Sequence, residues 1–174
     1  NKPIFAKTNG RLLGHVKDVY LNQELNWIVG LYLDKEGLIR RKEILILREQ
    51  IAVLGIDAIL VNDENVITDS RPHKESKEWG RLDQIIKRGV DTPGGTKIGV
   101  IGDIILTEDG DVFGFSLMRV FVEGPIVDNN GTIPRPALID TGNEDGVMTI
   151  DLPKLETLYQ QKDGSPAASN KEAA

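Results

Sequence analysis

The stretch GRLLGHVKDVYL, residues 10–21, occurs a second time in the chain as GTKIGVIGDIIL, residues 95–106. Both copies carry glycine at the first and fifth positions and aspartate at the ninth, with branched apolar residues between them. Branched apolar residues are typical of pleated strands, and glycine is typical of the turn before a strand. A stretch that returns in this form indicates that one small β unit is built twice in the chain.

Each copy continues in the same way. A polar turn follows, and then a second β-rich run, at residues 27–33 in the first copy and 112–117 in the second. This succession predicts a β-hairpin in each unit, with residues 22–26 and 107–111 as the two hairpin loops. A weaker parallel between residues 57–61 and 145–149 predicts one more short strand that closes each unit.

The segment between the copies has a different composition. It is dense in charged residues, and Trp79, Leu82 and Ile86 fall on one face of a helix. These positions predict a short helical linker. In the second unit, residues 118–136 form an inserted hairpin whose turn is predicted at residues 128–131.

The C-terminal part predicts a helix followed by a tail. Residues 151–159 read as a capped helix that buries Leu155, Leu158 and Tyr159, and the small and polar residues after it predict disorder. The expected organisation is therefore a first barrel at 1–68, a linker at 69–91, a second barrel with its C-terminal helix at 92–161, and a disordered tail at 162–174.

Composition narrows the classes of function. The net charge of −6 disfavours broad contact with nucleic acid, because that contact depends on clustered Lys and Arg. The chain has no cysteine, which excludes disulfides and thiolate chemistry and agrees with a reducing compartment. No stretch approaches the roughly 18 apolar residues of a membrane span, and the first residues do not resemble a signal peptide. We expect a cytoplasmic protein.

The repeated units resemble the PRC-barrel family, which includes a cytoplasmic module of the photosynthetic reaction centre and a ribosome maturation factor. The first unit carries the fuller resemblance, in Gly10, Gly14, residues 16–19 and 28–31, the basic cluster Arg40, Arg41 and Lys42, and residues 57–59. The second unit lacks the basic cluster. The resemblance implies a mainly β fold of two tandem small barrels, and the residues that it marks as fold-defining are Gly10, Gly14, Asp18, Gly30, Gly95, Gly99, Asp103 and Gly114.

Asp18 and Asp103 interrupt apolar strands at the same place in each unit. A carboxylate that faces inward needs hydrogen-bond partners, because an unpaired buried charge is costly. A scaffold position is expected in both units, whereas a catalytic site would rarely be duplicated at equivalent places. We therefore expect both residues to be structural.

One motif suggests chemistry. Residues 136–142 read PALIDTG, which looks like the Asp-Thr-Gly signature of retroviral-type aspartic proteases, with Asp140 as the catalytic residue. Those enzymes pair two such aspartates and need further elements downstream, for which the short remainder of this chain leaves no room. A loop between strands is the preferred interpretation, and the protease stays a remote alternative.

Neither a metal site nor a cofactor site is predicted. The acidic turns at 140–145 and 109–111 lack the ligand spacing of a calcium loop, and His15 and His73 lack a third ligand for zinc. No phosphate-binding or dinucleotide-binding glycine motif is present in the sequence. We expect no metal and no cofactor.

The resemblance also implies a role. Members of the family mostly act as docking or assembly modules, so the chain is expected to be a non-catalytic adaptor that docks on a larger complex. By family analogy that complex is photosynthetic, which would place the protein at the cytoplasmic face of a thylakoid or similar membrane. The alternative is an RNA-associated or ribosome-associated maturation factor. The preferred docking patch is Arg40, Arg41 and Lys42, and the second choice is the hairpin at 118–136.

Overall fold

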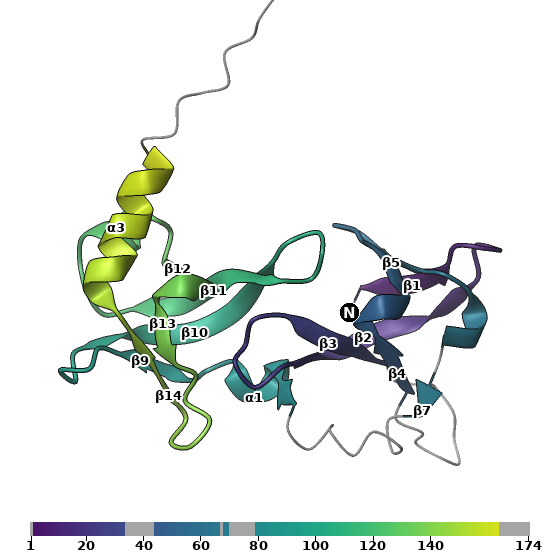
Figure 1. Cartoon of the computed structure of the whole chain (residues 1–174), viewed down its shortest axis with the longest axis horizontal. Coiled ribbons are helices and arrows are strands. Elements are labelled where there is room, and N and C mark those ends of the chain that lie inside the picture. The colour runs from purple at the N-terminus through teal and green to yellow at the C-terminus, as the bar shows by residue number, and fades with distance from the viewer. Residues whose placement is uncertain (1, 34–43, 67, 70–78, 164–174) are drawn as a thin grey trace, which may run out of the picture.

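A computed structural model describes residues 2–33, 44–66, 68–69 and 79–163 of the chain (Figure 1). These residues form two β-sheets that lie beside each other, with a C-terminal helix at the far end of the second sheet. The first sheet contains β1 (Pro3–Ala6), β2 (Leu12–Leu21), β3 (Ile28–Leu33), β4 (Ile44–Leu47), β5 (Ile51–Leu54), β6 (Ile59–Val61), β7 (Thr68–Asp69) and β8 (Gly80–Arg81). The second contains β9 (Gly89–Asp91), β10 (Lys97–Leu106), β11 (Val112–Val120), β12 (Thr132–Pro134), β13 (Leu138–Asp140) and β14 (Val147–Ile150). The predicted mainly β fold is confirmed.

The two sheets share one strand order. The first runs β5-β6-β1-β2-β3-β4, with β7 added beyond β4 and β8 beside β2, and the second runs β13-β14-β9-β10-β11-β12. In each sheet the sixth strand pairs in parallel with the first, and the other neighbours within this order pair antiparallel. A short 3-10 turn precedes the fifth strand in both, η1 (Arg48–Gln50) and η4 (Arg135–Ala137). The internal repeat of the sequence is therefore a repeat of topology.

The two predicted hairpins form, and their registers correspond. Asp18 is opposite Tyr32 in the first hairpin, and Asp103 is opposite Ser116 in the second. A register shift lies just before each aspartate, and another follows two residues after it. Matched irregularities of this kind show that the two copies share details of strand pairing as well as sequence.

The weaker third parallel was wrong by one residue. Ile59 pairs with Ile4 of β1, and the residue that pairs with the corresponding Val90 of β9 is Met148. The predicted parallel between residues 57–61 and 145–149 aligns Ile59 with Val147 instead. Because side chains alternate between faces along a strand, that alignment would have exchanged the buried and exposed faces. Both Ile59 and Met148 are buried.

Glycine is required where the second strand of each hairpin packs closely against the next strand of the sheet. A Cβ atom on Gly30 would lie 2.6 Å from the carbonyl oxygen of Ile46, and one on Gly114 would lie 2.4 Å from that of Ile133. These distances are too short for a real contact, so only glycine lets the third and fourth strands approach each other. The turn glycines Gly10 and Gly95 correspond in backbone conformation, because both have a positive φ, of +69° and +81°.

The core is aliphatic and runs through both units. Phe115 is the single aromatic residue among its largest fully buried side chains, and Ile and Leu supply the rest. Buried residues of both sheets, such as Leu21, Ile28, Ile98 and Phe115, belong to one continuous hydrophobic cluster. The low aromatic content of the sequence therefore corresponds to a core packed by branched side chains.

The helical part of the linker is shorter than predicted. Helix α1 covers Leu82–Ile85, preceded by β8, which pairs with β2, and followed by β9 of the second sheet. Trp79 precedes β8 and Ile86 has left the helical conformation, so the predicted helical face does not form as a whole. Strand pairing with the edge of β2 replaces the first helical turn, which supplies backbone partners that an isolated short helix lacks.

The C-terminal helix α3 (Leu152–Asp163) is confirmed, with Leu155 and Tyr159 buried. The Asp151 side chain accepts a hydrogen bond of 2.9 Å from the Lys154 N–H and so caps the helix. The inserted segment pairs β11 with β12 through a loop that contains α2 (Pro125–Asp128). The disordered tail was expected at 162–174, but α3 continues through Lys162 and Asp163, and residues 164–174 lie outside the described residues. Within the described ranges, no helix is long and apolar enough to cross a membrane.

Candidate binding groove

The two units meet through the loops of their long hairpins. The Ile28 N–H donates to the carbonyl of Gly110 at 2.9 Å, and the Val112 N–H donates to the carbonyl of Asn26 at 2.7 Å. These bonds flank an antiparallel bridge between Trp27 and Asp111. Backbone hydrogen bonds therefore join the two hairpin loops directly.

Two arginines at equivalent positions cross this junction in opposite directions. Arg48, the first residue of η1, donates to the carboxylate of Asp111 in the second unit at 2.8 Å. Arg135, the first residue of η4, donates to the carbonyls of Leu25, at 3.0 Å, and Glu24 in the first unit. Burial lowers the pKa of the Arg135 guanidinium, as expected for a cation that is partly removed from water. The contact between the units is thus approximately reciprocal.

An open groove of about 620 Å³ lies beside this junction. Its walls come from the start of β3, from η1 and β5, and from the β10–β11 loop, so both units contribute. The Gly110 backbone brings that loop against the end of β5, since a Cβ atom built there would lie 3.3 Å from the Leu54 Cδ1. The groove is therefore a product of the junction.

The floor and walls of the groove are rich in apolar side chains. Trp27 is 42% exposed and Val53 is 47% exposed, high values for large apolar residues that face one groove. Trp79 also lines it, with its ring edge-on to Tyr20 at 5.6 Å between centroids. Both tryptophans of the chain consequently lie in the groove. Exposed aromatic and aliphatic side chains in a concave surface are typical of binding sites.

The charged residues in the groove are mostly acidic. Among the described residues, Glu49, Glu108 and Asp109 line it together with one cation, Arg48. The Arg48 guanidinium is already paired with Asp111. The groove therefore presents a surplus of negative charge to whatever enters it.

Strand β5 forms one wall of the groove and is also the edge of the first sheet. Its residues are Ile51, Ala52, Val53 and Leu54, and the middle two are exposed. Among the residues that the structure describes, no strand pairs with the outer side of β5. An unpaired edge exposes backbone N–H and C=O groups that are able to accept another strand.

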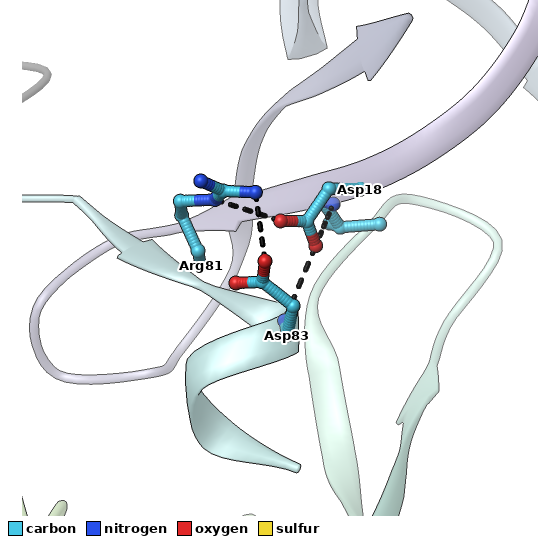
Figure 2. Close-up of polar contacts among 4 residues, drawn as sticks. Asp18, Arg81 and Asp83 are labelled. Carbon is cyan, nitrogen blue, oxygen red and sulfur yellow. Dashed lines mark hydrogen bonds and ion pairs between the residues drawn. The ribbon is translucent and has the colours of Figure 1, made fainter. Parts of the chain in front are cut away.

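A second polar feature concerns Asp18 and lies where β8 pairs with the edge of β2 that faces away from β3 (Figure 2). The Asp18 side chain is buried, and its Oδ2 accepts a hydrogen bond of 2.8 Å from the Arg81 Nε. Its Oδ1 accepts from the backbone N–H groups of Val19, at 2.9 Å, and Asp83, at 3.2 Å. The Arg81 guanidinium also donates to the Asp83 carboxylate at 2.7 Å. The carboxylate of Asp18 therefore fastens the segment after the first unit to strand β2.

Asp103, the counterpart of Asp18, has a different environment. It is exposed, and its carboxylate accepts the N–H of the following residue, Ile104, at 2.8 Å. The same local hydrogen bond occurs at Asp18, but Asp103 has no counterpart of the Arg81 contact among the described residues.

Desolvation, and next the charge of Asp18, raise the pKa of the Asp83 carboxyl above its ordinary value. The cluster of Asp18, Arg81 and Asp83 therefore exists in one unit, and its two carboxylates share one guanidinium.

The structure places the site residues predicted from the sequence in different parts of the chain. The basic cluster Arg40, Arg41 and Lys42 lies outside the described residues. Asp140 ends β13 on the surface, where its carboxylate accepts the Gly142 N–H at 2.7 Å in a local turn. In the described parts of the chain, no group of three or more His, Asp or Glu side chains comes close enough to hold a metal ion.

The groove itself was not predicted from the sequence. The groove arises because residues 108–110 pack against β5 from far along the chain. One signal was available: residues 51–54 read IAVL, an apolar strand without a charged residue or proline. The sequence matches no protein-family profile, and it has no significant match among curated proteins.

Proposed function

We propose that this protein is a non-catalytic adaptor that docks on a larger complex and that the groove at the junction of its two units is the docking site. The observation that carries the proposal is the groove itself, in which Trp27 and Val53 remain exposed beside an unpaired strand edge. Exposed apolar residues gathered in one concave place are the usual anchors of protein recognition.

We further propose that the two units are PRC-type barrels. The support is the shared strand order, the matched register shifts around Asp18 and Asp103, and the glycines that allow close strand approach in both units. The family resemblance then suggests an assembly role at the cytoplasmic face of a photosynthetic membrane, with a photosynthetic complex as the partner. This part of the proposal depends on the resemblance of the sequence.

The reciprocal junction supports an adaptor because it fixes the two walls of the groove relative to each other. Arg48 and Arg135 each reach into the other unit, and two backbone hydrogen bonds connect the hairpin loops. A site whose walls are held in place loses less conformational entropy when a partner binds. The groove is thus suited to binding a partner without rearrangement.

Co-purification from the native cells, by means of the tagged full-length chain, tests the proposal. The variant Trp27→Ala should lose a specific assembly that the wild-type chain retains, while its circular dichroism stays unchanged. The control is Phe113→Ala, which truncates another aromatic residue of similar exposure outside the groove lining. Loss of the assembly with both variants, or with neither, would place the docking site elsewhere.

A further inference from the structure

The equivalent edge strands of the two units differ in how they are protected. Strand β13 is the edge of the second sheet, as β5 is of the first. The pairing of β5 with β6 and of β13 with β14 makes Val53 the counterpart of Asp140. A charged residue on an edge strand discourages other strands from pairing with it. The second unit has such a residue, and the first has an exposed valine in its place.

Strand β5 is therefore open to strand addition in both its backbone and its side chains. It carries no charged residue and no proline, and Ala52 and Val53 are exposed. An apolar edge strand without a charged residue or proline is able to pair with another strand. The groove that β5 borders supplies apolar contacts, including those of Trp27, for the side chains of an added strand.

Charge restricts the kind of segment that fits. Glu49 lies in the turn η1, two residues before the start of β5, and the loop with Glu108 and Asp109 lies against the end of β5 at Leu54. Acidic groups thus stand near both ends of a strand that spans about 13 Å at the usual rise per residue. A complementary segment has apolar residues in alternate positions and Lys or Arg on both sides of them.

We infer that the partner of the groove enters as an extended peptide segment, with alternating apolar residues flanked by basic ones, and adds a strand to the free edge of β5. This inference rests on the proposed docking function of the groove and specifies its partner. Backbone hydrogen bonds to β5 supply much of the affinity, and the apolar contacts and the acidic ends of the groove supply the specificity.

A displayed library of random twelve-residue peptides, selected against the intact chain, tests the inference. Selected peptides should show alternating apolar residues with Lys or Arg on either side. Made as synthetic peptides, they should change the tryptophan fluorescence of the chain, because both tryptophans line the groove. Binding should also protect the amides of residues 51–54 from hydrogen exchange, which docking through side chains alone would not do.

Variants designed from the repeat make the test specific. Val53→Asp transfers the residue of the second unit to the first and should abolish peptide binding, whereas Val53→Thr, which keeps the β-branched shape, should retain it. Ile139→Asp adds the same charge to β13 and should leave binding unchanged. Reversal of Glu108 and Asp109 to Lys should weaken the binding of the basic peptides by about fivefold to tenfold at low salt. Reversal of the exposed Glu123 and Glu144 to Lys should leave the binding unchanged.

Three outcomes would overturn the inference. They are selected peptides without the alternating pattern, peptides that bind without protecting residues 51–54, and peptides that bind Val53→Asp as well as the wild type. None of them decides the docking function, which the co-purification of Trp27→Ala tests independently. An adaptor that loses its assembly with Trp27→Ala but fails the peptide test would bind a folded surface instead of an extended segment.

Discussion

Removal of the Asp18 carboxylate should destabilise the protein, while removal of its repeat counterpart should not. Asp18→Ala deletes the charge-assisted bond to Arg81 and leaves the Asp83 N–H without its acceptor. Hydrogen bonds to charged groups contribute about 1.5–3 kcal/mol, and a buried group left unpaired costs about 1–3 kcal/mol. Arg81 is 37% exposed on its side chain, so water replaces part of its lost contact. The expected loss in the free energy of unfolding is about 2 kcal/mol.

Thermal unfolding of the intact chain, followed by circular dichroism, measures this effect. For a protein of this size a loss of about 2 kcal/mol corresponds to a decrease of about 4–8 °C in Tm. Asp103→Ala is the matched control, because Asp103 occupies the same strand position and keeps the same local bond but is exposed. Its Tm should stay at the wild-type value.

Arg81→Leu extends the test from the other side of the contact. It leaves the Asp18 carboxylate buried without its guanidinium and should cost at least as much stability as Asp18→Ala, because an unpaired buried charge is expensive. The double variant should cost less than the sum of the two single ones, since both remove one interaction. Equal losses for Asp18→Ala and Asp103→Ala, or strictly additive losses for Asp18 and Arg81, would refute the reasoning.

Three further predictions concern other parts of the fold. Gly114→Ala places a Cβ atom against the Ile133 carbonyl and should lower stability by about 1–3 kcal/mol in urea unfolding, whereas Gly94→Ala, whose nearest neighbour is 3.8 Å away, should not. Arg135→Ala removes the donor to the Leu25 carbonyl and should cost about 1–2 kcal/mol in the same assay, more than Arg48→Ala, which breaks a partly exposed ion pair. Burial raises the pKa of the Tyr159 hydroxyl to about 12, so the unfolded chain loses this proton first and the free energy of unfolding should fall as the pH rises from about 10 to about 12. Tyr159→Phe should remove that part of the fall in urea midpoints, and an identical pH dependence in both proteins would contradict the assignment.

The hairpins of both units could be predicted from the sequence because their signals are local. Glycine, aspartate and branched apolar residues stand at fixed short spacings, and strand pairing follows within a few residues. The third strand match failed by one residue because a short apolar run with few markers does not fix its register. The weak point was therefore the part of the pattern with the fewest glycines and charges.

The candidate site could not be predicted because it depends on contacts between distant segments. The sequence indicated that Asp18 needs hydrogen-bond partners, but its partner Arg81 lies in a segment that was expected to be helical. In the same way, the groove forms where the loop with Glu108 and Asp109 meets β5. Periodicity along one segment contains no information about which loop will cover it.

The reciprocal contact between the units has the geometry of a symmetric homodimer, although one chain supplies both halves. In a true homodimer every substitution appears twice, so a change that improves one copy of a surface also alters the other. Here each half is free to differ. Val53 and Asp140 occupy equivalent edges with opposite character, and Asp18 is held in a cluster that Asp103 lacks. Because one chain supplies both halves, the first half has an edge strand without charge while the edge strand of the second half carries Asp140, so only the first edge favours an added strand.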